Sequence, residues 1–85
     1  MAKNVEIYTL AYCPYCQKAK YMLHEHNVEF KEIPCDDDEE KMREELTKKY
    51  NLASLATFPQ IIIDGINIGG YSDLKQKVES GEIVF

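Results

Sequence analysis

Two cysteines separated by two residues, Cys13-Pro14-Tyr15-Cys16, constrain this chain more than any other feature. Residues 5–9, just before them, are rich in β-branched and aromatic side chains and predict a short strand. Proline is favoured at the first position of a helix, because the N–H that it lacks would have no partner there. Pro14 therefore predicts a helix over residues 14–26 with Cys13 as its N-cap.

The predicted position of Cys13 favours a reactive sulfur. Unpaired backbone N–H groups and the positive end of the helix dipole stabilise a thiolate at a helix N-terminus. Cysteines in such positions ionise more readily than free thiols. Cys16 lies three residues on, on the same helical face and one turn deeper. We therefore predict a catalytic pair in which Cys13 attacks a disulfide and Cys16 resolves the mixed disulfide that forms.

Length and composition are typical of one small globular domain over residues 1–85. Hydrophobic residues make up 45% of the chain, which is enough for a core, and the formal net charge of −5 disfavours nucleic acids and anionic membranes as partners. No apolar stretch resembles a signal peptide or a transmembrane helix, so we expect a cytoplasmic protein. Three cysteines, an odd number, also argue against a disulfide-stapled secreted scaffold.

The rest of the chain alternates between strand-like and helix-like patterns. Short runs with β-branched residues predict strands, and longer runs with apolar residues every three or four positions predict helices. Beyond residues 5–9 and 14–26, the expected elements are a strand at 29–34, a helix at 39–50, strands at 60–63 and 66–68, and a helix at 73–80. The expected order is β-α-β-α-β-β-α.

Local signals connect these elements. Asp38 and Ser72 are predicted to cap the second and third helices, and Asp64-Gly65 predicts a two-residue hairpin turn. The first two strands are joined by a helix and must be parallel, whereas the hairpin adds antiparallel strands. We therefore expect an α/β domain with a four-stranded mixed sheet covered by three helices.

Four separated motifs occur along the chain in a fixed order: Cys13-Pro14-Tyr15-Cys16, Thr57-Phe58-Pro59-Gln60, Ile68-Gly69-Gly70 and Ser72-Asp73-Leu74. In this order, and over essentially the whole chain, the sequence resembles the glutaredoxins, the small glutathione-using branch of the thioredoxin fold. The resemblance implies a single domain with a thioredoxin-like glutaredoxin fold. It also implies a glutathione-dependent thiol–disulfide oxidoreductase that reduces protein disulfides and glutathione mixed disulfides.

The resemblance further implies a glutathione site. In the family, the peptide bond before the equivalent of Pro59 is cis and lies against the reactive cysteine, and the backbone before it binds the cysteinyl part of glutathione as an added strand. Gly70 lets the backbone approach the ligand, and the start of the last helix receives its γ-glutamyl group. The expected glutathione-binding residues are Tyr15, Thr57, Phe58, Pro59, Gly70, Tyr71, Ser72 and Asp73.

Two positions depart from the family pattern. Glutaredoxins usually carry a lysine three residues before the first cysteine, where it pairs with the glycine carboxylate of glutathione, but this chain has Leu10. We therefore expect weaker glutathione binding than in a lysine-bearing relative, with partial recovery in Leu10→Lys. Phe58 stands where valine is commonest and is expected to narrow the groove.

Other interpretations of the two thiols stay open. Half of a zinc site would need two more ligands, and the chain has no second pair of cysteines at this spacing. An iron–sulfur carrier would hold a cluster between two subunits through Cys13 and glutathione, but such glutaredoxins generally have another residue in place of Pro14. A donor reduced by thioredoxin reductase is the third alternative, which the absence of the lysine keeps open.

We expect glutathione as co-substrate, no metal, and disulfide-containing or glutathionylated proteins as partners of a monomer. Cys35, which follows the second strand, is interpreted as a buried small hydrophobe, with a regulatory thiol as the alternative. The acidic run at residues 36–40 is interpreted as a solvated loop that leads into a helix, although its charge would also suit a metal ion.

Overall fold

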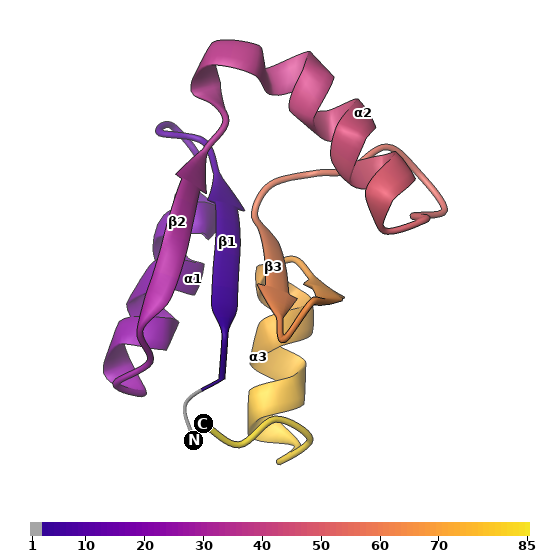
Figure 1. Cartoon of the computed structure of the whole chain (residues 1–85). Helices are drawn as coiled ribbons and strands as arrows, with labels where there is room; N and C mark the ends of the chain where they lie inside the picture. Colours follow the sequence, from indigo (N-terminus) through magenta and orange to yellow (C-terminus); the bar gives the residue numbers. More distant parts are fainter. Residues whose placement is uncertain (1–2) are drawn as a thin grey trace.

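The computed structural model describes residues 3–85, and their order of elements is the predicted one (Figure 1). The elements are β1 (Val5–Thr9), α1 (Pro14–Glu25), β2 (Phe30–Pro34), a 3-10 turn η1 (Asp36–Asp38), α2 (Glu39–Lys49), β3 (Gln60–Ile63), β4 (Ile66–Gly69) and α3 (Tyr71–Glu79). Within this range, none of the helices combines the length and the apolar character needed to span a bilayer.

The sheet has the strand order β2-β1-β3-β4. β1 pairs with β2 in parallel and with β3 antiparallel, and β3 pairs antiparallel with β4. Asp64 and Gly65 link β3 to β4 with positive φ angles of 52° and 81°, the backbone that a two-residue hairpin turn requires. The predicted four-stranded mixed sheet with three helices is therefore confirmed.

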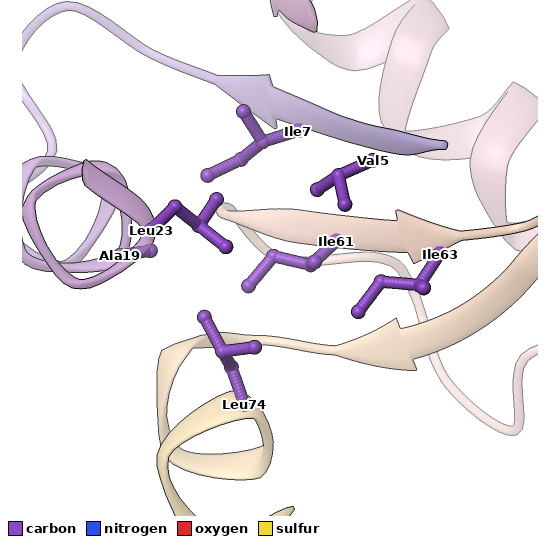
Figure 2. Packing of buried hydrophobic residues seen from close by; sticks show 7 residues of the cluster. All are labelled: Val5, Ile7, Ala19, Leu23, Ile61, Ile63 and Leu74. Atoms are coloured by element: carbon purple, nitrogen blue, oxygen red, sulfur yellow. The ribbon is translucent and has the colours of Figure 1, made fainter. Parts of the chain in front are cut away.

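One face of the sheet packs against α1 and α3. Successive side chains of a strand point to opposite faces, so residues two positions apart share a face. Figure 2 shows side chains from β1 and β3 pointing toward those of the two helices. The buried cluster consists of Val5, Ile7, Ala19, Leu23, Ile61, Ile63 and Leu74. It fixes the position of α1, and with it the position of the two thiols at the start of this helix.

A second cluster covers the opposite face of the sheet, beneath α2. It consists of Tyr8, Leu10, Cys35, Leu46, Ala56 and Ile62, and Cys13 and Phe58 pack against its edge. The segments before α1 and before β3, which carry Cys13 and Phe58, therefore meet at this cluster. Cys35 is buried here as a small hydrophobe, as predicted.

Of the two predicted helix caps, Asp38 is confirmed by position and Ser72 is wrong. α3 begins at Tyr71 with Gly70 as its N-cap, two residues before the predicted start. The reason is that the Asp73 carboxylate, inside the first turn, accepts a hydrogen bond of 3.1 Å from the Gly70 N–H and so caps the helix without Ser72. Asp38 is the N-cap of α2, but its side chain makes no capping hydrogen bond because the 3-10 turn leads directly into the helix.

A polar network joins α1 to the two strands beneath it. Lys20 on α1 lies 2.9 Å from the carboxylate of Glu32 on β2, and the hydroxyl of the buried Thr9 on β1 donates to the same carboxylate at 2.8 Å. These two donors, Lys20 first, hold the pKa of Glu32 below its usual value. Among the ion pairs of the described residues, only the pair of Lys20 and Glu32 joins α1 to the sheet.

Candidate active site

Cys13 caps α1, as predicted from Pro14. Its Sγ accepts a hydrogen bond from the Cys16 N–H at 3.3 Å, so one of the free amide groups of the first turn points at the sulfur. Cys13 is half-buried, and its Sγ lies 3.6 Å from the carbonyl oxygen of Phe58. The sulfur is therefore within reach of a bound molecule and lies at the positive end of the helix dipole.

Cys16 has a different environment on the same helix. It is fully buried, with 0% of its surface exposed. Burial, followed by a hydrogen bond with Cys13, raises the pKa of Cys16 to about 12, so this sulfur stays protonated at neutral pH. The motif thus places an accessible sulfur at the helix terminus and a protected thiol directly behind it.

A cleft of about 240 Å³ opens beside the carbonyl of Phe58, close to Cys13. The rings of Tyr15 and Tyr71 flank it, with their centroids 6.1 Å apart. The cleft is lined by Tyr15, Thr57, Phe58, Pro59, Gly70, Tyr71, Ser72 and Asp73. The structure therefore brings all eight residues predicted for glutathione together around one cavity.

The cleft is formed by chain segments that lie far apart in the sequence. The Phe58–Pro59 peptide bond is cis, as the resemblance implied. Gly69 has a φ of 111°, and a Cβ there would come within 2.5 Å of the Asp73 carboxylate, so only glycine fits between β4 and α3. The first turn of α3 is thereby placed with its free N–H groups next to Pro59, on the wall of the cleft.

The side-chain amides of Gln60 and Asn67 support the wall of the cleft that contains Thr57. The Gln60 amide donates to the carbonyl of Thr57 at 2.7 Å and accepts from the Asn67 amide at 3.0 Å. Gln60 is buried, so both hydrogen bonds are shielded from water. They connect β3 and β4 to the segment that carries Phe58, which keeps the cleft wall in a fixed position relative to the sheet.

A network centred on Glu39 was not predicted as part of the site. The Glu39 carboxylate accepts from the Tyr12 hydroxyl and from the Arg43 guanidinium, both at 2.7 Å. Arg43 also donates to the carbonyl of Ala56 at 2.9 Å and lies 5.0 Å from the centre of the Phe58 ring. The sequence indicates only the i,i+4 spacing of Glu39 and Arg43. Their contacts with the segments on both sides of the cleft depend on the tertiary fold.

Leu10 is more than a missing charge. Only 3% of its surface is exposed, and it packs in the cluster beneath α2. Leu10 and Tyr8 stand two residues apart and share this face of the sheet, which the strand periodicity could have shown. The side chain of a lysine at position 10 would have to extend out of an apolar cluster before its ammonium could contact a ligand. Leu10→Lys is therefore expected to cost packing energy, and the recovery of glutathione binding by this substitution stays a prediction.

The family model "Glutaredoxin" matches residues 5–68. Glutaredoxin 3 of Escherichia coli is 48% identical over 71 residues, which are 84% of this chain and 81% of that protein. Glutaredoxin 1 of Rickettsia bellii is 43% identical over 77 residues, which are 91% of this chain and 79% of that protein.

Solved structures show the same fold. The crystal structure of glutaredoxin 1 from Francisella tularensis, complexed with cacodylate, superposes with a TM-score of 0.84 at 36% identity and covers 95% of this chain and 98% of that one. A buckwheat glutaredoxin solved in complex with glutathione has a TM-score of 0.81 over 94% of this chain and 72% of that one. At 21% identity, the buckwheat protein supports the fold alone.

We predict that Leu10→Lys lowers the free energy of unfolding by about 2–4 kcal/mol, because the substitution removes a packed side chain and brings a charge to an apolar cluster. The control Leu10→Met keeps the volume and should cost less than about 1.5 kcal/mol. Urea unfolding of both variants measures the difference. A lysine variant as stable as the parent would show that the ammonium reaches solvent freely, and the original expectation of stronger glutathione binding would then stand.

Proposed function

The chain belongs to the glutaredoxin family and is a glutathione-dependent thiol–disulfide oxidoreductase, and from this premise we propose how its residues divide the work. Cys13 is the nucleophile and Cys16 the resolving thiol. The observation that carries this assignment is the contrast between the two sulfurs: Cys13 is accessible at a helix N-terminus, whereas Cys16 is buried and protonated.

In the dithiol route, the Cys13 thiolate attacks one sulfur of a substrate disulfide. A mixed disulfide forms and one substrate thiolate leaves. Cys16 then attacks the Cys13 sulfur, releases the second substrate thiol and closes a Cys13–Cys16 disulfide. Two glutathione molecules restore the dithiol: the first forms an adduct on Cys13, and the second removes the first as glutathione disulfide.

In the monothiol route, Cys13 acts without Cys16. Its thiolate attacks the glutathione sulfur of a glutathionylated protein, and the protein thiol leaves. A second glutathione then attacks the adduct on Cys13 and restores the thiolate. This route needs a site that orients glutathione with its sulfur at Cys13, and the adjacent cleft supports that proposal.

We propose the following arrangement of glutathione in the cleft. The backbone of Phe58 pairs with the cysteinyl part, because its carbonyl lies 3.6 Å from the Cys13 sulfur. The free N–H groups of the first turn of α3 bind the γ-glutamyl carboxylate, and Asp73 accepts from the ammonium of the same group. The remaining lining residues, Tyr15, Thr57, Pro59, Gly70, Tyr71 and Ser72, shape the walls.

Arg43 is proposed to supply part of the positive charge that position 10 lacks. Its guanidinium lies over the ring of Phe58, which lines the cleft and packs against the cluster that contains Leu10. Glu39 and the Ala56 carbonyl take two of its donors, and the planar guanidinium carries more than these two. A glycine carboxylate at the Phe58 end of the cleft would therefore still meet a cation.

Disulfide-containing and glutathionylated proteins are the proposed substrates, and the chain is proposed to act as a monomer in the cytoplasm. One copy contains both sulfurs and the whole cleft, so the proposed cycle needs no second subunit. A reducing compartment also suits a chain with an odd number of cysteines, three in all.

We predict that Cys16→Ser abolishes reduction of protein disulfides but keeps deglutathionylation close to the parent rate, because only the dithiol route needs a resolving sulfur. Cys13→Ser should abolish both activities. Turnover of a glutathione mixed disulfide, coupled to glutathione reductase, measures the monothiol route, and insulin reduction measures the dithiol route. Equal loss of both activities in Cys16→Ser would contradict the assignment.

We predict that Asp73→Asn raises the KM for glutathione roughly tenfold, as expected when one hydrogen bond loses its charged acceptor. Asparagine can still accept from the Gly70 N–H, so the start of α3 should persist. Glu79→Gln is the control, since it removes one negative charge at the other end of the same helix. Steady-state kinetics measure both variants, and an unchanged KM in Asp73→Asn would exclude the proposed ammonium contact.

A further inference from the structure

The resolving step poses a problem that the proposed roles of the cysteines leave unsolved. Cys16 must lose its proton to attack the mixed disulfide, yet it is fully buried. An unpaired thiolate is costly in such a place. A helix N-terminus assists Cys13, which caps the helix, but Cys16 already lies inside the first turn. Some other group must therefore stabilise the charge that develops on Cys16.

Lys20 stands in the right place on α1. Side chains four residues apart on a helix are neighbours, with about 5–6 Å between their Cβ atoms. Cys16 and Ala19 are buried against the sheet, and Lys20 reaches the β2 carboxylate on that same side of the helix, so its ammonium lies on the sheet side, one turn beyond Cys16. In agreement with this geometry, the Lys20 charge lowers the pKa of Cys16, against the larger effect of burial.

The ammonium is held in this position by the sheet. Glu32 on β2 accepts from Lys20, and the Thr9 hydroxyl on β1 fixes the same carboxylate oxygen. About a quarter of the Lys20 side chain is exposed, so water screens its charge less than that of a surface lysine. The charges that act on Cys16 come from Cys13 and Lys20, and the backbone of Leu10, just after β1, contributes a hydrogen bond.

We propose that Lys20 is a positioning residue for the resolving step: held by Glu32 and Thr9, its ammonium stabilises the thiolate that Cys16 forms as it attacks Cys13. The proposal rests on the assigned roles of the two cysteines. In this step the Cys16–Cys13 bond forms and the bond between Cys13 and the substrate sulfur breaks. Cys16 is oxidised, and the substrate sulfur is reduced and leaves as a thiolate. Cys16 loses one proton to solvent and the leaving thiolate takes one up, so the protons balance.

The experiment separates the two sulfurs in time. The reduced protein is mixed in a stopped-flow instrument with one equivalent of an aromatic disulfide that releases a coloured thiolate. The first release reports attack by Cys13, and the second reports closure by Cys16. The variants are Lys20→Met, which keeps the apolar stem, and Lys20→Arg, which keeps the charge. Lys77→Met is the control. It removes a lysine of the same charge from α3, where Lys77 forms an ion pair with Glu82.

At neutral pH, Lys20→Met should slow the second release roughly three- to tenfold and leave the first close to the parent rate, as expected for the loss of one partly screened charge. The positive charge favours the Cys16 thiolate, so without it the second release should require a higher pH. Lys20→Arg and Lys77→Met should both behave like the parent.

A second release that is unchanged in Lys20→Met would overturn the proposal. Equal slowing in Lys20→Arg would also overturn it, since packing and not charge would then be responsible. If instead the roles assigned to the two cysteines are wrong, the result is different. Cys13→Ser would then still release the first coloured thiolate, and Cys16→Ser would still release the second. Thermal unfolding of each variant confirms that the compared proteins are folded.

Discussion

The hydrogen bond from the Cys16 N–H to the Cys13 sulfur is the contact on which the site depends. It exists because β1 ends and α1 begins within a few residues, with Pro14 at the first helical position. The same turn that presents one sulfur to the solvent buries the other against the sheet. Two chemically identical side chains thereby receive different access to solvent, and the proposed order of the two exchange steps follows from this difference.

The rest of the fold brings a binding surface to that sulfur. The segment before β3 and the first turn of α3 are distant in the sequence, yet both line the cleft beside Cys13. Antiparallel pairing of β3 with its two neighbours places the start of β3 beside the end of β1, and the hairpin returns the chain to the start of α3. α2 holds the segment before Phe58: Arg43 donates to the Ala56 carbonyl, and the Ala56 N–H donates to the Thr47 hydroxyl.

The sequence was sufficient wherever a local cause acts. Pro14 predicted the N-cap, Asp64-Gly65 predicted the hairpin, and the family motifs predicted which residues would share a cleft. The start of α3 was missed because Asp73 caps it from inside the helix, where a serine one residue earlier gave the stronger signal. The contacts of Arg43 and Lys20 could not be predicted, since each joins a helix to segments far along the chain and no local pattern records them.

We propose that Cys13 is the accessible, reactive sulfur and Cys16 the protected thiol, and this contrast is the central claim. Alkylation of Cys13→Ser and Cys16→Ser at neutral pH, with the label assigned by peptide mapping, tests it most directly. The account predicts that Cys13 in Cys16→Ser reacts faster than glutathione under the same conditions, and that Cys16 in Cys13→Ser reacts only after unfolding. Alkylation of Cys13 no faster than glutathione, or rapid labelling of Cys16 in the folded protein, would contradict it.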